Sequence, residues 1–169
     1  NLEELGISLS PEDEAEVLRR IVSLGDSKET ITAEDLPFII ADVLERKDFR
    51  HIELLTCSIT SELDHASTVN IEVNVNGEIH EASGSGNGGF DAFVDAIRKV
   101  SLPGFEFPKL VDYELLIPKG GSTSALTEVF ITWRDGPRTV RTRGVSPNQV
   151  LAGVGATLRM LNMKLHQAA

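Results

Sequence analysis

The sequence predicts an α+β fold in which two repeated β-β-β-α units pack together, preceded by a two-helix linker subdomain. Three observations predict it. The period of the apolar residues changes from helical to alternating near His51. A strand, strand, strand, helix pattern then occurs twice. In each copy a short turn, Asn76-Gly77 or Asp135-Gly136, separates two alternating strands. One helix covers a three-stranded sheet only partly, so two units facing each other would complete a single core.

The composition is that of a water-soluble globular protein, with 41% hydrophobic and 25% charged residues in a length of 169. No apolar run is long enough to span a bilayer, no secretory signal is present, and the single Cys57 excludes a disulfide framework within one chain. We therefore expect a cytoplasmic protein without membrane contact. The net charge of −10 disfavours nucleic acid, whose phosphates need clustered Lys and Arg. Because the sequence begins at Asn1 without a methionine, we expect a piece of a longer polypeptide.

Residues 1–48 are predicted to form the linker subdomain. Its first helix starts at Ser10-Pro11, an N-cap followed by a proline in the first turn, and ends at Gly25. Its second helix starts near Thr32. The apolar stripes comprise Val17, Leu18, Ile21 and Val22 in the first helix, and Leu36, Ile39, Ile40, Val43 and Leu44 in the second. Two helices of this length bury too little surface to be stable alone, so we expect them to dock on another surface.

Residues 49–169 are predicted to form one domain of two units, at about 49–102 and 108–166. The first unit has strands near 52–59, 69–75 and 78–83, followed by a helix from about Phe90.

The second unit repeats this order, with strands at 111–117, 129–133 and 138–143 before a final helix. The interval from Asn76-Gly77 to Asp135-Gly136 is shorter by a single position than the interval from Gly84 to Gly144. We therefore predict one extra residue, a β-bulge, in the second return strand.

A glycine-rich segment, Gly84-Ser85-Gly86-Asn87-Gly88-Gly89, precedes the first long helix and matches the spacing of a dinucleotide-binding fingerprint. The strand before it belongs to a hairpin, so the local sheet is antiparallel, which argues against dinucleotide binding. Two interpretations remain. The glycines permit a sharp turn and a close approach of two backbones, or they leave a helix N-terminus open to an anion.

Comparison of the two units favours an anion site. In the second unit, Ser146 and Gln149 form a predicted capping box with Ser146 as the N-cap. The first unit has Gly86 at the corresponding position, so its helix is expected to begin with unpaired N–H groups at the positive end of the helix dipole. Such a site suits a small carboxylate, and Gly86→Ser is then expected to weaken binding.

We predict no catalytic residue, no metal ligand and no cofactor in this sequence. The four histidines, His51, His65, His80 and His166, show no metal-ligand spacing. Asp91 and Asp95 lie one helical turn apart and could form an acid–base pair, but a dipole complement and a solvated side chain explain them better.

The final helix contains a group of small residues: Ala152, Gly153, Gly155 and Ala156. Glycine costs a helix interior about 1 kcal/mol relative to alanine. We therefore expect another element to pack close to this backbone, either the other unit or a partner helix, and we favour a contact in a homodimer.

Three segments resemble the C-terminal regulatory domain of the α-isopropylmalate synthase family. Residues 83–93 (SGSGNGGFDAF) resemble its glycine-rich turn, and residues 142–162 (TRGVSPNQVLAGVGATLRMLN) resemble its final helix. Residues 5–44 are similar to the helical linker that joins this domain to the family's catalytic barrel.

The resemblance implies a regulatory domain that dimerises and binds the end-product amino acid of its pathway as a feedback inhibitor. Leucine is this effector in isopropylmalate synthases, and isoleucine in the similar citramalate synthases. The parent would be an acyltransferase that condenses acetyl-CoA with a 2-oxo acid, 2-oxoisovalerate for the isopropylmalate synthases, in a barrel that holds a divalent metal. That barrel is not in this sequence, so the fragment is expected not to be an enzyme.

Effector binding is carried over by the resemblance to the glycine-rich segment and to the start of the final helix. The residues are Gly84, Ser85, Gly86, Asn87, Gly88, Gly89, Phe90, Ala92, Gly144, Val145, Ser146, Asn148 and Gln149. Leucine is the favoured effector. Isoleucine in a citramalate synthase, and a dimerisation module without a ligand, remain the alternatives.

Overall fold

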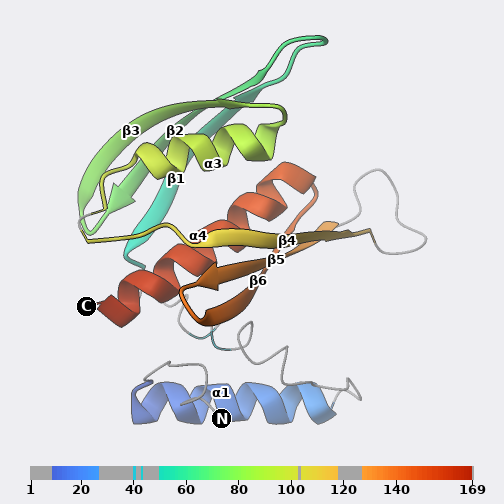
Figure 1. The fold of residues 1–169 in the computed structure, drawn as a ribbon. Coiled ribbons are helices and arrows are strands. Elements are labelled where there is room, and N and C mark those ends of the chain that lie inside the picture. Colours follow the sequence, from blue (N-terminus) through green and yellow to red (C-terminus); the bar gives the residue numbers. More distant parts are fainter. Residues whose placement is uncertain are drawn as a thin grey trace.

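The computed structural model describes residues 9–26, Ile40, Val43 and residues 50–102, 104–117 and 127–168. Helices and strands follow the predicted order (Figure 1). Their bounds are α1 Pro11–Asp26, β1 Ile52–Thr60, β2 Ser67–Val75, β3 Glu78–Gly86, α3 Gly89–Lys99, β4 Lys109–Leu116, β5 Thr127–Asp135, β6 Arg138–Ser146 and α4 Gln149–Ala168. The predicted α+β fold with two β-β-β-α units is confirmed.

The two units share one topology. Each has a three-stranded antiparallel sheet, in the order β1-β2-β3 or β4-β5-β6. The second strand, the third strand and the helix of one unit are separated from their counterparts in the other by the same interval. The middle strands turn alternate residues into the core, as their sequence pattern predicts. These buried residues are Val69, Ile71, Val73 and Val75 in β2 and Val129, Ile131 and Trp133 in β5.

The hairpin turn of the second unit lies one residue later than predicted. In the first unit Asn76-Gly77 forms the turn, and both residues have a positive φ, as a type I′ turn requires. In the second unit Asp135 pairs with Arg138, so Gly136-Pro137 forms the turn. Gly136 has a φ of 58°, whereas the ring of Pro137 holds a negative φ, which is the pattern of a type II′ turn. The third strands of the two units therefore have the same length and position relative to the second strands. The predicted β-bulge in the second return strand is wrong.

The irregularities lie instead in the first strand of each unit. Leu55 in β1 and Val111 in β4 are extra residues opposite the neighbouring strand. Such a bulge changes which side the following residues face. The residues of β4 that pack against the core are Leu110, Tyr113 and Leu115. The strand predicted at 111–117 has its apolar residues at alternate positions, but the two outermost of them do not face the core, because Val111 is 45% exposed and Ile117 is 64% exposed.

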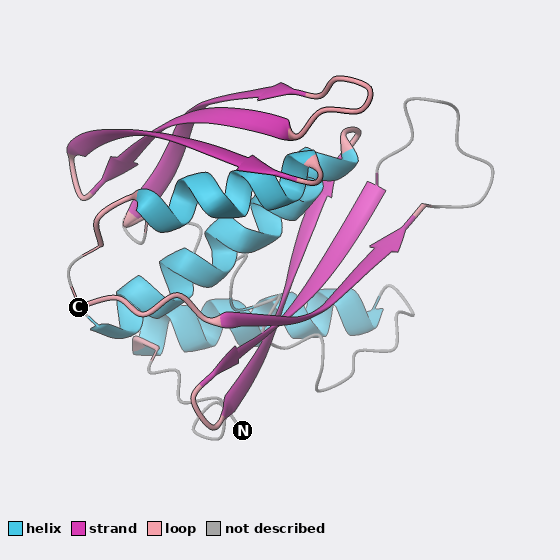
Figure 2. Cartoon of the chain, turned by 45° about the horizontal axis from the view of Figure 1, so that its top comes forward, coloured by secondary structure: helices cyan, strands magenta, loops and turns pink. Residues whose placement is uncertain are grey.

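Each helix lies on its own sheet at a glycine. A Cβ on Gly84 of β3 would overlap the backbone oxygen of Ala92 in α3. A Cβ on Gly144 of β6 would overlap the backbone oxygen of Ala152 in α4. The helices run next to each other, each with its sheet on its outer side (Figure 2). One continuous cluster of buried apolar side chains from both units forms the core.

The side chain of Asn162 in α4 joins the second unit to the first. Its Oδ1 accepts hydrogen bonds from the backbone N–H groups of His51 (2.8 Å) and Ile52 (2.9 Å). Its Nδ2 donates to the carbonyl oxygens of Ile52 (3.0 Å) and Leu158 (3.1 Å). The start of β1 is therefore attached to the last helix, and its backbone polar groups are paired where the strand becomes buried.

Helix α1 starts at Pro11, as predicted, and lies on the far side of the molecule from the first sheet (Figure 1). The predicted apolar stripe is only half covered, because Val17 is buried but Leu18 and Val22 are 63% and 55% exposed. In the second predicted helix Ile40 and Val43 are helical and buried. The rest of that helix lies outside the described residues.

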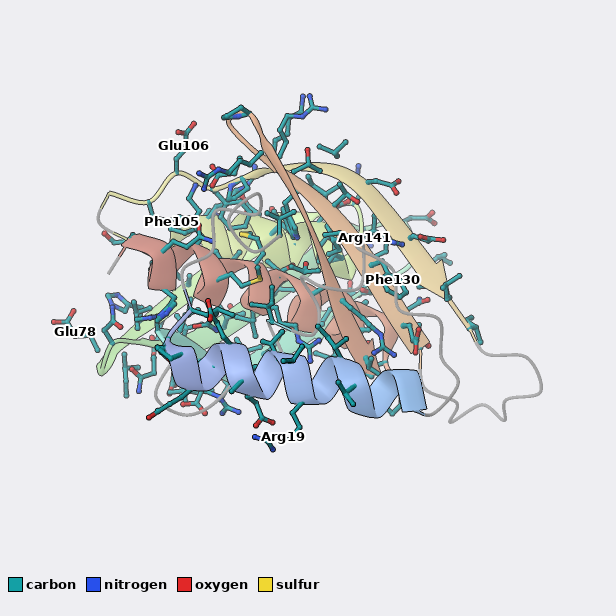
Figure 3. All side chains as sticks on the ribbon, turned by 90° about the horizontal axis from the view of Figure 1, so that it is seen from below. Arg19, Glu78, Phe105, Glu106, Phe130 and Arg141 are labelled. Atoms are coloured by element: carbon teal, nitrogen blue, oxygen red, sulfur yellow. The ribbon has the colours of Figure 1, made fainter. Side chains whose placement is uncertain are left out.

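Arg141 joins an aromatic and an acidic side chain on the second sheet. The guanidinium of Arg141 lies over the ring of Phe130, 4.5 Å from its centre, and donates a hydrogen bond to Glu114 (2.6 Å) (Figure 3). No helix in the described ranges is long and apolar enough to cross a membrane.

We expect Gly84→Ala and Gly144→Ala each to lower the free energy of unfolding by about 1–3 kcal/mol, because the added methyl group forces the strand away from the helix backbone. Gly155→Ala in α4 is the matched control. A Cβ there would make only an ordinary contact, 3.7 Å from Gly144 Cα, and alanine favours the helix by about 1 kcal/mol. Urea unfolding measures all three variants. An equal loss of stability in all three variants would contradict the close contact of Gly84 and Gly144 with the helix backbones.

Candidate functional site

The N-terminal ends of α3 and α4 open onto one hollow of about 450 Å³. It is lined by residues from both helix starts and from β4: Gly88, Gly89, Phe90, Asp91, Leu110, Tyr113, Leu115, Gln149 and Val150. The two helix starts are close, since a Cβ on Gly89 would lie 3.4 Å from the side chain of Val150. Apolar walls with a few polar groups, at this volume, are typical of a site for a small molecule.

The two helices that meet at the hollow begin differently. At the start of α4, Asn148 Oδ1 accepts hydrogen bonds from the N–H groups of Val150 (2.9 Å) and Leu151 (3.2 Å). Ser146 Oγ accepts from the N–H of Asn148 (3.1 Å). The N-cap is therefore Asn148, and the prediction of Ser146 is wrong by two residues.

The N-cap of α3 is Gly88, the counterpart of Asn148 in the first unit, and it makes no side-chain cap hydrogen bond. The first turn of α3 therefore presents N–H groups without a side-chain acceptor at the positive end of the helix dipole. The two units therefore differ in helix capping, as predicted, but the residue without a capping side chain is Gly88 and not Gly86.

The apolar side of the hollow is built by two aromatic rings. Phe90 and Tyr113 lie with their ring centres 5.0 Å apart. Burial raises the pKa of Tyr113, so its hydroxyl stays protonated at neutral pH. Both rings press against the backbone of α4 at Gly153, where a Cβ would lie 2.8 Å from Tyr113 Oη and 2.9 Å from Phe90 Cδ2.

The small residues of α4 pack inside the chain. Ala152 and Ala156 are fully buried, and both lie against Gly144 of β6. Gly153 lies under Phe90 and Tyr113, and Gly155 is in contact distance of Gly144. The favoured prediction of a dimer contact through these residues is therefore wrong, because the helix needs this face for its own strand and for the first unit.

The predicted effector-binding residues divide into three groups. Those that line the hollow are Gly88, Gly89, Phe90 and Gln149. Those at the contact between strand and helix are Gly84, Gly86, Ala92 and Gly144. The rest do not line the hollow: Ser85 lies in β3, Asn87 in the bend after it, and Val145 on β6, while Ser146 and Asn148 form the cap of α4.

The glycine-rich segment is less of a turn than predicted, because β3 continues to Gly86. A Cβ on Gly86 would lie 2.6 Å from Asp91 Cβ and 2.7 Å from the backbone nitrogen of Ala92. Close backbone approach is therefore the right interpretation of Gly84 and Gly86. Gly86→Ser would disturb this packing, whereas Gly88 has open space around its Cα.

The predicted site residues do not include the wall that β4 contributes to the hollow. The strand predicted at 111–117 contains Tyr113 and Leu115, but their position at the two helix starts depends on the bulge at Val111 and on the packing of the units.

Asp91 is one of the residues that line the hollow, whereas the carboxylate of Asp95 is hydrogen-bonded to Lys99 and Ser85. Hydrogen bonds from Lys99 Nζ (2.8 Å) and then from the N–H of Ser85 (3.0 Å) lower the pKa of Asp95. The two carboxylates do not form an acid–base pair.

A second hollow of about 420 Å³ lies against the first sheet. Its lining is mostly hydroxyl, amide and carboxylate side chains: Thr56, Ser58, Asn70, Glu72, Glu81 and Ser83, with Ile71 and Ala82. Two glutamates repel an anion and the apolar surface is small, so the hollow between the helix starts is the better candidate. Among the described residues no group of three or more His, Cys, Asp or Glu side chains could hold a metal ion.

Comparison with known proteins agrees with this architecture. The family model of the LeuA allosteric (dimerisation) domain matches residues 30–165. The chain belongs to the LeuA allosteric (dimerisation) domain family. The resemblance stated from residues 83–93 and 142–162 is thereby confirmed.

Similar proteins of the LeuA group are named as synthases. The chain is 33% identical to a 2-isopropylmalate synthase of Cupriavidus pinatubonensis, over 99% of this chain and 32% of that protein. It is 32% identical to a 2-isopropylmalate synthase of Methanocaldococcus jannaschii, over 94% of this chain and 30% of that protein. It is also 32% identical to a candidate (R)-citramalate synthase of Methanothermobacter thermautotrophicus, over 97% of this chain and 33% of that protein. The chain spans about a third of the length of these relatives.

We expect Asn148→Ala to lower the free energy of unfolding by about 1 kcal/mol, because two N–H groups of α4 lose their acceptor. Asn87→Ala, one residue before the cap of α3, is the matched control and should have little effect. Thermal unfolding by circular dichroism measures both. A control that loses as much stability as Asn148→Ala would argue against Asn148 as the cap.

Proposed function

We propose that this chain is the feedback-regulatory, dimerising part of a 2-isopropylmalate synthase and that the hollow between α3 and α4 binds leucine as allosteric inhibitor. Membership of an allosteric and dimerisation family supports regulation, and two of the three relatives described above are named 2-isopropylmalate synthase. In this proposal residues 1–48 are a linker, residues 49–169 are the regulatory domain, and the protein is a homodimer. Condensation of acetyl-CoA with 2-oxoisovalerate belongs to a separate catalytic barrel.

The observation that carries the proposal is an uncapped helix N-terminus that opens onto an apolar hollow whose lining residues include Asp91. The N–H groups of the first turn of α3, beginning at Gly89, suit the carboxylate of a ligand. The carboxylate of Asp91 suits an ammonium group. An amino acid carries both charges.

The side chain of the amino acid would contact the apolar wall of Leu110, Tyr113, Leu115 and Val150. A branched aliphatic side chain gains free energy from this burial. Lysine would place a second ammonium group among apolar side chains, which is unfavourable.

A citramalate synthase domain that binds isoleucine is the second candidate, and the similarity to the Methanothermobacter protein favours it. One methyl position in an apolar pocket is worth about 1–3 kcal/mol, so a direct comparison of ligands separates the two.

Calorimetric titration with leucine, isoleucine, valine and lysine tests the proposal. We expect saturable binding of leucine and a tenfold or greater preference over lysine. Tighter binding of isoleucine than of leucine would contradict the assignment to a 2-isopropylmalate synthase and support the citramalate synthase alternative. The remaining outcome is no heat of binding with any of the four amino acids. If analytical ultracentrifugation then shows a folded dimer, the result would support a dimerisation module without a ligand.

We expect Gly88→Asn to weaken leucine binding at least tenfold while raising the free energy of unfolding by a few tenths of a kcal/mol. The new side chain reproduces the Asn148 cap and occupies the N–H groups that the ligand would use. Gly88 has an extended backbone with φ −145° and open space around it, so asparagine fits without strain. Calorimetry and urea unfolding measure the two effects, and unchanged affinity in the stabilised variant would exclude this helix start as the carboxylate site.

We expect Asp91→Asn to weaken leucine binding about tenfold, because the ammonium group loses its charged partner. The same variant should bind 4-methyl-2-oxopentanoate, which has the leucine side chain but no ammonium group, at least as well as the unchanged protein. Competition against leucine measures both ligands. A parallel loss for both would indicate that Asp91 maintains the pocket shape instead.

A further inference from the structure

Two histidines that are distant in the sequence meet at the end of the molecule opposite the hollow. His51 Nε2 lies 3.4 Å from His166 Nδ1, and the ring centres are 5.6 Å apart. His51 directly precedes β1, and His166 lies in the last turn of α4. The fold itself brings the rings together, since Asn162 of α4 holds the backbone of His51 and Ile52. Spacing along the sequence cannot reveal this pair.

The ring of His51 is oriented so that one nitrogen is an acceptor that faces His166. Its Nδ1 lies 3.1 Å from Asn76 Oδ1. Because an amide oxygen only accepts hydrogen bonds, Nδ1 carries the hydrogen and Nε2 is left unprotonated in the neutral ring. This Nε2 is the atom nearest to His166. A histidine whose second N–H donates to an oxygen is the usual arrangement for a metal ligand.

The separation of the two nitrogens suits a metal ion better than it suits a hydrogen bond. A distance of 3.4 Å is long for an N–H donor and its acceptor. Two zinc–nitrogen bonds of about 2.0–2.1 Å at the tetrahedral angle place the ligand nitrogens about 3.4 Å apart. In the metal-free protein a hydrogen on His166 Nδ1 lies between the rings, and metal binding would require this hydrogen to move to Nε2 of the same ring, so that both ligand rings stay neutral.

We propose that His51 Nε2 and His166 Nδ1 form a two-histidine site for a divalent transition-metal ion of the zinc class, with water completing the coordination. Imidazole nitrogen is a preferred ligand of Zn²⁺ and a poor one of Mg²⁺. No third His, Cys, Asp or Glu ligand is available in the described part of the chain, so the expected affinity is micromolar and far from that of a closed structural site.

The surroundings of the pair favour a cation. The carboxylate of Asp13 in α1 acts electrostatically on His166. The negative charge of Asp13 also offsets part of the charge of a bound ion.

A metal ion at this position would cross-link the start of the first unit to the end of the second. The site is separate from the amino-acid hollow, since Gln149 and His166 are about 25 Å apart along α4. An ion that binds only the folded chain raises its melting temperature in a concentration-dependent way.

Thermal unfolding of EDTA-treated protein with increasing Zn²⁺, at pH 7.5, tests the site. We expect the melting temperature to rise with Zn²⁺ and to stay constant with Mg²⁺. His51→Gln and His166→Gln should each abolish the rise. His51→Gln keeps the backbone N–H that bonds to Asn162, so the fold is expected to persist. His80→Gln is the matched control, because His80 is a half-buried histidine of β3 whose Nε2 lies 3.8 Å from Glu78.

Titration with Co²⁺, followed by its visible absorption, provides a second measurement that does not depend on stability. We expect at least a tenfold loss of affinity in either histidine variant and none in His80→Gln. A Zn²⁺ response that is absent in the unchanged protein, or that survives in either histidine variant, would overturn the proposal. Leucine binding is measured separately and neither supports nor weakens it.

Discussion

The contact between a glycine of the third strand and the backbone of the following helix is the constraint on which the rest of the structure depends. At Gly84 and at Gly144 no side chain fits between strand and helix. The helix therefore lies as close to its sheet as two backbones allow, in the same way in both units. Two helices that are placed alike and run next to each other bring their N-terminal ends to the same side, where β4 crosses them.

The two units have nearly the same backbone, but they differ in the polar group that caps the helix. Asn148 supplies an acceptor to the first turn of α4, whereas Gly88 supplies none to α3. Helix starts attract anions because their N–H groups lack partners and the dipole is positive there. Two such starts beside an apolar wall, of which only one is capped by its own side chain, make a site with a defined polar end and a defined apolar end.

The C-terminal end of α4 contacts the start of the first unit. Asn162 pairs with the backbone of the residues that enter β1, and His166 reaches the ring of His51. Asp13 of α1 contributes its charge to the same place. The last helix therefore connects the first sheet and the second sheet, while its beginning forms part of the hollow. Its length explains how one element serves two distant sites.

Elements with a strong period could be predicted from the sequence because burial alone determines their pattern. β2 and β5 alternate without interruption, since one face of each is fully buried. The turn at Gly136-Pro137 could not be placed in this way. Asp135-Gly136 has the local pattern of a turn, but the pairing of β5 with β6 places Asp135 opposite Arg138 and Val129 opposite Gly144, and a turn one residue earlier would shift this pairing by two residues.

The sequence by itself determined the order of the elements, the repeat and the family, because periodicity, capping residues and turn residues act over a few neighbouring positions. Only the tertiary structure decided which ends meet. Gly89 lies beside Val150, and His51 beside His166, through the packing of two units whose contacts span many positions and leave no local pattern. The cap of α4 moved from Ser146 to Asn148 for a related reason, since β6 extends to Ser146 as long as β5 offers it a partner.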